Sequence, residues 1–231
     1  MPRTRSAGTG PAHHRTMAEY ALQELREAII LGELAPGTPL RLDELARQYD
    51  MSISPIREAV RRLEALGLAK HVPHHGAKVL PFDPDELRDL FAVRLALESL
   101  AVRQAAERLT PEGAEAAWSH LARLDRARAA RDVREAMRAH ADFHFTLYDA
   151  CRSEWLPALI RPAWDRAERY RPALLSAEGE LQRRHREIDE RLLARCAAGD
   201  ADGAAGALYE HLELASEFFA VELGGRGIFE R

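Results

Sequence analysis

The sequence predicts a mainly α-helical protein made of two domains. Its 231 residues exceed one typical domain, and the 46% that are hydrophobic are enough to fill two cores. Aromatic residues make up only 6% of the chain, and the abundance of Ala and Arg favours helices over sheets. Hydrophobic residues recur at helical spacing over most of the chain, so we expect a small N-terminal domain followed by an all-α bundle.

The N-terminal domain is expected to begin with two amphipathic helices. Residues 19–31 place leucines and isoleucines on one face and stop at Gly32, after which a Pro-Gly turn reverses the chain. Residues 42–49 form a second, short helix with an apolar inner face. Only residues 50–52 link it to the next helical segment, and so short a link predicts a helix-turn-helix.

The third helix organises this domain. Residues 52–67 read SISPIREAVRRLEALG, in which Ser52 or Ser54 can cap the helix through its hydroxyl and Gly67 can end it. Apolar residues follow one face and arginines the others, namely Ile56, Val60, Leu63 and Leu66 against Arg57, Arg61 and Arg62. Such a helix fits the major groove of DNA, although a surface helix with solvated arginines has the same pattern.

Two short strand-like runs follow the third helix. Residues 68–71 and 77–80 flank a Pro-His-His-Gly turn at residues 73–76, which predicts a β-hairpin. Three helices and a hairpin in this order predict a winged helix-turn-helix. This context favours the DNA-binding interpretation of the third helix over the surface-helix one.

The N-terminal part contains REAIILGELAPGTPL, LARQYDMSISPIREAVRRLEALGL and HHGAKV. These motifs, over about residues 20–81, resemble the N-terminal domain of the GntR family of bacterial transcription regulators. The resemblance implies that double-stranded DNA is the partner and that the helix start and the hairpin contact it through Ser52, Ser54, Arg57, His75 and Gly76. Many relatives have an arginine where this chain has Ile53, which implies a different operator sequence, because arginine can bind guanine through two hydrogen bonds.

The net charge of −4 divides unevenly along the chain. Residues 1–80 carry 11 Lys and Arg against 9 Asp and Glu, whereas the remainder carries 22 against 28. The excess of positive charge therefore lies in the half that is expected to bind DNA phosphates.

No feature of the sequence indicates an exported or membrane protein. No apolar run is long enough to span a bilayer, the N-terminus lacks the apolar core of a signal peptide, and Cys151 and Cys196 fall in helical patterns. We therefore expect a cytoplasmic protein. Its expected parts are a disordered tail (1–16), the winged helix-turn-helix domain (17–81), a helical domain (82–223) and a C-terminal tail (224–231).

The helical domain has a clear start, with Asp83 as N-cap and Pro84 at the first helical position. Helical spacing then continues almost without interruption, which predicts an all-α bundle. The expected helices cover residues 84–109, 111–130, 132–151, 154–170, 177–198 and 200–223.

Four histidines fall on apolar faces of these helices. His140 and His144 share one face at a spacing that suits two ligands from one helix turn, and His185 and His211 lie on the last two helices. Each buried imidazole needs a polar partner, and one metal ion would satisfy all four at once. Four histidines with separate hydrogen-bond partners are the alternative.

Arg94 is a charged residue within the apolar face of the first bundle helix. It can pair with Glu98, one turn further on, or it can point into the bundle and bind the carboxylate of a ligand. One arginine can do both.

The helical domain contains RLALE, DFHFTLYDA and RHREIDERLLARCAAGD, followed by His211. These motifs, over about residues 84–220, are similar to the FCD ligand-sensing domain of FadR-type GntR regulators. The resemblance implies a divalent metal ion held by an aspartate and three histidines, with a small carboxylate beside it. His144, His185 and His211 match the histidines, whereas His140 stands at the aspartate position.

The histidine at position 140 bears on which metal is expected. A site of four imidazoles favours transition metals such as zinc, nickel or copper over manganese or magnesium, and we expect zinc or nickel. Alternatively, His140 does not bind the ion, and a ligand or a water molecule completes the shell.

The sequence thus predicts a metabolite-responsive transcription regulator, most simply a repressor, that binds a palindromic operator as a homodimer and responds to a small acidic effector. A metal-dependent hydrolase and a DNA-binding scaffold whose bundle only dimerises are the alternatives. We expect no enzymatic activity, because no glutamate of the HExxH type lies between His140 and His144 and no nucleophile–base pair stands out.

Overall fold

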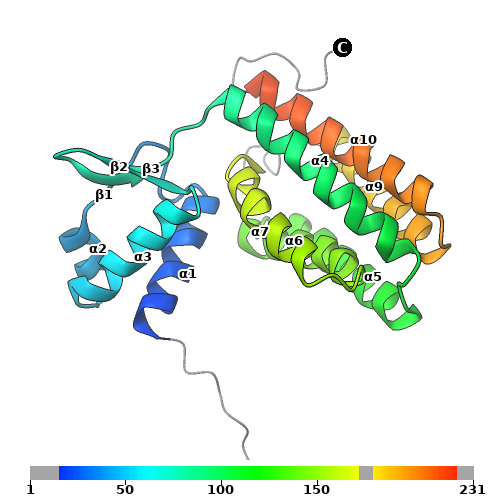
Figure 1. Cartoon of the computed structure of the whole chain (residues 1–231), viewed down its shortest axis with the longest axis horizontal. Coiled ribbons are helices and arrows are strands. Elements are labelled where there is room, and N and C mark those ends of the chain that lie inside the picture. The colour runs from blue at the N-terminus through cyan, green and yellow to red at the C-terminus, as the bar shows by residue number, and fades with distance from the viewer. Residues whose placement is uncertain (1–15, 172–178, 223–231) are drawn as a thin grey trace, which may run out of the picture.

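The computed structural model describes residues 16–171 and 179–222. A small N-terminal unit and a larger helical bundle lie side by side and are joined by the segment before residue 84 (Figure 1). The tails expected at residues 1–16 and 224–231 lie outside the described residues, apart from Thr16. The boundary expected at residues 81–82 falls in the joining segment.

The N-terminal unit consists of α1 (Met17–Ile30), α2 (Leu42–Gln48), α3 (Ile53–Ala65), β1 (Pro39–Leu40), β2 (Ala69–Val72) and β3 (Gly76–Val79). The strands form an antiparallel sheet in the order β1-β3-β2, so the expected hairpin is extended by one further strand. The sequence did not predict β1, because two residues are too few to show an alternating pattern.

Local signals in the sequence explain where these helices begin and end. Thr16 and Glu19 form a capping box at the start of α1, in which each side chain accepts the backbone N–H of the other. Gly67 follows α3 with a φ of +69°, the left-handed conformation that favours glycine after a helix. The prediction that Gly67 ends this helix is therefore confirmed.

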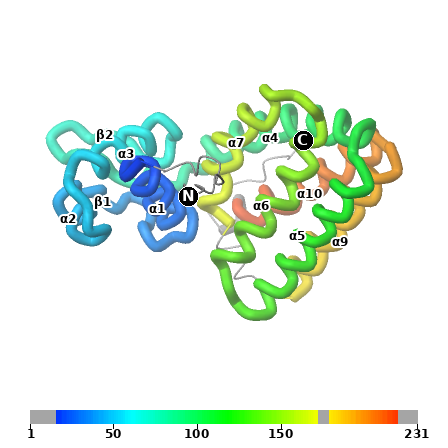
Figure 2. Tube along the Cα trace, turned by 90° about the horizontal axis from the view of Figure 1, so that it is seen from below, coloured from blue at the N-terminus to red at the C-terminus, as the bar shows by residue number. Residues whose placement is uncertain are grey.

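The bundle consists of α4 (Pro84–Ala106), α5 (Pro111–Ala129), α6 (Val133–Asp149), α7 (Trp155–Glu168), α9 (Glu180–Ala197) and α10 (Ala201–Glu222). Asp83 accepts the backbone N–H groups of Asp85 and Glu86, as expected for the N-cap of α4. The helix α4 packs against α7 and α10, α10 packs against α9, and α5 packs against α6 (Figures 1 and 2).

Each part of the chain has its own hydrophobic core. Leu25, Ile56 and Leu63 are fully buried in the N-terminal unit, and Phe91 and Phe143 are fully buried in the bundle. The apolar faces that the sequence predicts are therefore the faces that pack. The prediction of a mainly α fold, with a winged helix-turn-helix followed by an all-α bundle, is confirmed.

The helix α1 of the N-terminal unit contacts the bundle through ion pairs. Arg26 donates hydrogen bonds to both carboxylate oxygens of Asp165 on α7, one of them over 2.8 Å. Glu27 pairs with Arg134 and Arg138 on α6, with N–O distances of 2.7 Å. Figure 2 shows α1 on the side of the N-terminal unit that faces these helices.

Two further observations concern the cysteines and the question of a membrane-spanning helix. Cys151 and Cys196 are buried free thiols. Within residues 16–171 and 179–222, none of the helices combines the length and the apolar character needed to cross a bilayer.

Candidate functional site

The start of α3 is exposed and is not capped by a side chain. Ser52 is the N-cap residue by its backbone conformation, but its hydroxyl makes no capping hydrogen bond, contrary to the expected hydroxyl cap. Ser52, Ile53 and Ser54 are all exposed. The first backbone N–H groups of α3 therefore remain open, and a helix N-terminus of this kind attracts phosphate through these groups and the helix dipole.

A groove of about 330 Å³ separates α3 from the hairpin of β2 and β3. Arg57 and Arg61 line it on the helix side, and His75 and Gly76 line it on the hairpin side. Arg62, by contrast, pairs with Glu58 over 2.9 Å. The structure thus brings Arg57, His75 and Gly76 to one surface next to the exposed start of α3.

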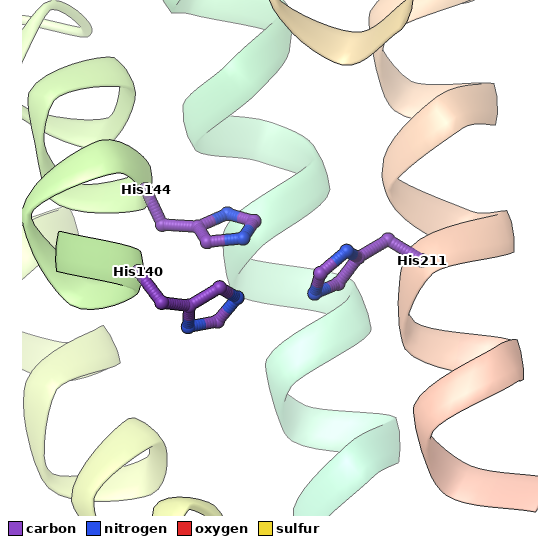
Figure 3. A group of neighbouring side chains, drawn as sticks. All are labelled: His140, His144 and His211. Carbon is purple, nitrogen blue, oxygen red and sulfur yellow. The ribbon is translucent and has the colours of Figure 1, made fainter. Parts of the chain in front are cut away.

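Three of the four predicted histidines meet at the centre of the bundle. His140 and His144 on α6 point toward His211 on α10 (Figure 3). One nitrogen atom from each ring can be chosen so that all three lie within 4.8 Å of one another. All three side chains are buried. Three imidazoles so placed could hold a metal ion.

His185 lies next to this group but not within it. Its ring centroid is 5.2 Å from that of His211, and the side chain is buried on α9. Both of its ring nitrogens are buried without a hydrogen-bond partner. The structure therefore places the fourth predicted histidine beside the other three.

The environment of His144 determines which ring nitrogen carries its proton. The hydroxyl of Tyr148 donates its one proton to Glu98 over 2.7 Å, so its oxygen accepts the hydrogen bond from Nδ1 of His144 at 3.2 Å. Burial raises the pKa of Tyr148 well above its usual value, which keeps the hydroxyl protonated. Nε2 of His144 is therefore the unprotonated nitrogen, and it has no hydrogen-bond partner.

His140 has a different set of neighbours. Arg171 donates a hydrogen bond to its Nε2 over 2.8 Å and is held in turn by Glu168 over 2.7 Å. The ring of Trp164 stacks on His140 with a centroid distance of 5.2 Å. A metal ion at Nε2 of His140 would have to take the place of the Arg171 hydrogen bond.

Asp189 is a site residue that our sequence reasoning missed. One of its carboxylate oxygens lies 2.8 Å from Nδ1 of His211 and 3.7 Å from Nε2 of His144. Its position four residues after His185, on the same buried face of α9, is the signal that could have found it. Burial by itself would raise the pKa of Asp189. The approach of His211 and the charge of Arg128 outweigh this effect, so the pKa of Asp189 is lower than usual and the carboxylate is ionised.

The polar atoms of this cluster lack the partners that buried groups normally have. Those with no hydrogen bond are Nδ1 of His140, Nε2 of His144, both nitrogens of His185 and His211, and both oxygens of Asp189. Leaving so many buried polar atoms unpaired is costly, and a metal ion would satisfy several of them at once. The donor set of imidazoles and a carboxylate thus fits a divalent metal ion.

The protonation of the histidines also fits metal binding. Burial lowers the pKa of His140 and His144 well below the usual value and lowers that of His185 to about 2. These three imidazoles are therefore neutral at neutral pH. A neutral imidazole has the lone pair that a metal ion needs.

Arg94 makes the ion pair that the sequence allowed. Its guanidinium donates to both oxygens of Glu98, over 2.6 and 3.3 Å, and lies 4.7 Å from the ring centroid of Trp164. Through Glu98 and Tyr148 it belongs to the same hydrogen-bond chain as His144. A ligand carboxylate at Arg94 would compete with Glu98.

Two family models match the chain. The model described as "Bacterial regulatory proteins, gntR family" matches residues 17–79, and the model described as "FCD domain" matches residues 89–214. GntR regulators bind DNA, and FCD domains bind small-molecule effectors and often a metal ion.

Relatives and solved structures with similarity to most of the chain are regulators. The uncharacterized HTH-type transcriptional regulator BphR of Paraburkholderia xenovorans is 32% identical over 87% of this chain and 84% of its own length. The HTH-type transcriptional repressor GlaR of Escherichia coli is 30% identical over 81% of this chain and 89% of its own length. The structure of E. coli McbR/YncC, at 26% identity, has a TM-score of 0.81 and covers 90% of this chain and 99% of that one. The chain therefore belongs to the GntR family of transcription regulators and carries an FCD domain after its DNA-binding domain.

Proposed function

We propose that this regulator is a repressor that binds a palindromic operator as a homodimer and is controlled by a small carboxylate effector next to a metal ion in the bundle. The observation that carries the proposal is the group of buried imidazole nitrogens without hydrogen-bond partners at the centre of the bundle. A domain that only dimerised would have no reason to leave these atoms unpaired. As a DNA-binding regulator, the protein would act in the cytoplasm.

The proposed DNA-binding face consists of Ser52, Ser54 and Arg57 on α3, with His75 and Gly76 on the hairpin. The exposed start of α3 would enter the major groove, and the hairpin would lie over the minor groove. The open N–H groups and hydroxyl at Ser52 support this role, because both can bind phosphate oxygens.

The proposed metal ligands are His140, His144, His185 and His211, with zinc or nickel as the ion that such imidazoles favour. When bound, the ion would supply a positive charge for a carboxylate ligand. The chain's own residues prepare the site: Tyr148 orients His144 through its Nδ1 hydrogen bond, which leaves Nε2 directed into the cluster.

Arg94 is the proposed residue for the effector carboxylate. Its guanidinium is planar and can form two parallel hydrogen bonds with a carboxylate, as it does with Glu98. Because it is joined to His144 through Glu98 and Tyr148, a carboxylate at Arg94 would lie close to the metal site.

Control of DNA binding requires that the bundle affect the N-terminal unit, and α7 offers the connection. Trp164 contacts the rings of His140 and His144, at centroid distances of 5.2 and 5.1 Å. The next residue, Asp165, binds Arg26 of α1. A ligand that moves Trp164 would therefore also alter the contact between α7 and the DNA-binding unit.

Repression and dimerisation have separate support. GlaR is described as a repressor, and we extend that direction of control to this chain. Val93 and Leu100 on α4 and Trp155 and Leu159 on the adjoining α7 expose large apolar side chains, which a second copy could cover. A dimer would place two recognition helices on successive turns of the operator.

The experiment that tests this proposal uses the full chain and its own regulatory DNA. Genomic fragments that bind the protein are selected, and the operator is located by footprinting. Fluorescence anisotropy then compares operator and random DNA, with added zinc or with chelator, in the presence of a panel of small carboxylates. We expect binding at least about 10³-fold tighter to the operator, and a shift of about 5-fold or more with one carboxylate. Specific binding that no metal ion and no carboxylate alters would favour the scaffold alternative instead.

A further inference from the structure

We propose that Asp189 is a direct oxygen ligand of the metal ion held by His144 and His211. This inference rests on the proposed metal site and adds to it a residue from α9. The two side chains that α6 brings to the site, His140 and His144, are both imidazoles. With Asp189 as a ligand, the ion would also have a carboxylate in its coordination shell.

The first argument is the position of the carboxylate. Ligands that lie about 2.0–2.2 Å from one ion are roughly 3–3.6 Å from one another, the smaller value for right angles and the larger for a tetrahedron. The oxygen of Asp189 is 3.7 Å from Nε2 of His144 and 2.8 Å from Nδ1 of His211. Both distances are close to those of atoms that share an ion.

The second argument is that Asp189 differs from the other buried acids that the structure describes. Glu98 accepts hydrogen bonds from Arg94 and Tyr148, and Asp165 and Glu168 each accept them from an arginine. Asp189 is completely buried, and neither of its oxygens has a hydrogen-bond partner within residues 16–171 and 179–222. A completely buried carboxylate without hydrogen bonds needs a partner that carries positive charge, and a metal ion among the imidazoles provides one.

Two other cationic partners for Asp189 fit the structure less well. Arg128 is near enough for its charge to act on Asp189, but no hydrogen bond joins these two side chains among the described residues, and Nε of Arg128 is buried without a partner. Nδ1 of His211 lies 2.8 Å from one oxygen of Asp189, but this contact leaves the second oxygen without a partner. A carboxylate that only oriented His211 would have no reason to approach His144 as well.

The test compares the wild-type chain with Asp189→Asn, which keeps the shape of the side chain and removes its charge. Asp165→Asn is the matched control, since it removes another buried carboxylate, one that is bound to Arg26 of α1 and has no contact with the imidazoles among those the structure describes. Zinc affinity is measured by competition with a chromophoric chelator, and the d–d absorption spectrum is recorded after loading with cobalt. Thermal melting of the metal-free proteins monitors folding.

If Asp189 is a ligand, Asp189→Asn weakens zinc binding by more than about 100-fold, the upper end of losses for residues that only support a ligand. The cobalt spectrum changes because an oxygen leaves the shell. The metal-free variant melts at the same or a higher temperature, because a buried unpaired carboxylate has been removed. Asp165→Asn keeps the wild-type affinity and spectrum.

An unchanged zinc affinity in Asp189→Asn would overturn the inference, and so would a weaker affinity with an unchanged cobalt spectrum, since the latter assigns Asp189 a positioning role on His211. If Asp189→Asn does not fold, Asp189→Leu, which fills the same space without polar atoms, is measured in its place with the same expected results. A wild-type chain that binds no zinc would instead contradict the proposed function, so the two failures are distinguishable.

Discussion

Arg26 of α1 donates two hydrogen bonds to the carboxylate of Asp165 on α7, and these bonds connect the DNA-binding unit to the bundle. Asp165 is buried, so this pair is shielded from solvent on the α7 side. The adjacent Trp164 contacts two of the clustered histidines. One turn of α7 therefore touches both the proposed metal site and the unit that binds DNA.

Removing this contact should reduce communication between the two parts. We expect Arg26→Gln to keep its metal content but to lower the coupling free energy between metal binding and operator binding by about 0.5–2 kcal/mol. The measurement is the ratio of operator dissociation constants with metal ion bound and with chelator. Arg183→Gln, in an exposed ion-pair cluster on α9, is the control and should keep the wild-type ratio. An unchanged ratio in Arg26→Gln would remove this pair from the coupling.

The DNA-binding face gives a second prediction. Arg57 is exposed beside the groove and has no ion pair among the described residues, so Arg57→Ala should fold normally. If Arg57 contacts phosphate, affinity for operator and random DNA falls to a similar extent and the salt dependence decreases by about one unit of slope. Anisotropy titrations at several salt concentrations measure both quantities. Arg62→Ala serves as control because Arg62 pairs with Glu58, and an Arg57→Ala protein with wild-type affinity would exclude Arg57 from the interface.

The sequence predicted the fold well because local signals, namely capping residues and the spacing of apolar residues, mark each helix. Asp83 and Pro84 mark the start of α4, Gly67 marks the end of α3, and the apolar spacing of each helix identifies the face that packs. The strand β1 was not predicted, because its two residues are defined by pairing with β3 and not by any pattern of their own.

The candidate site was only partly predictable. The spacing of His140 and His144 on one buried face of α6 was enough to bring them together, and their meeting with His211 required only that apolar faces pack. For Asp189 the only signal was its position four residues after His185, and this signal is weak because an aspartate among charged neighbours is usually exposed. Its burial depends on how α9 packs against α10, which is a tertiary property.

The lowered pKa values of the histidines predict how stability depends on pH in the metal-free protein. His140, His144 and His185 have pKa values below the usual one in the folded state, largely because of burial, so below pH 6.5 the unfolded chain binds protons that the folded chain does not. The free energy of unfolding should therefore fall as the pH falls, by at most about 1.4 kcal/mol per pH unit for each histidine.

Urea denaturation between pH 7.5 and 5.5, with chelator present, measures this dependence. We expect His185→Gln to lose about a third of the slope, since one of three contributing histidines is removed. Substitution of the exposed His74 is the control and should leave the slope unchanged. A free energy of unfolding that does not vary over this range would show that these imidazoles are not held neutral by the fold.

Arg94 gives a prediction that separates its two interpretations. Arg94→Lys keeps the charge but loses the planar guanidinium that binds Glu98 at two points, so stability should fall by about 1–3 kcal/mol. If Arg94 also binds the effector, affinity for the active carboxylate should fall by about tenfold or more in calorimetry. The loss of stability without a loss of affinity would leave the Glu98 ion pair as the only role of Arg94.

The central claim, that the clustered histidines hold a metal ion, is tested most directly by counting metal ions in the purified chain. After incubation with zinc, nickel or manganese at neutral pH and removal of the excess, we expect about one zinc or nickel ion per subunit in the wild type. His144→Ala and His211→Ala should lose most of it, whereas His120→Ala, on α5 beside Arg123, should keep it. Zinc or nickel should also raise the melting temperature of the wild type by mass action. A wild-type protein that stays metal-free under these conditions would contradict the claim and leave four buried histidines that serve the packing of the bundle alone.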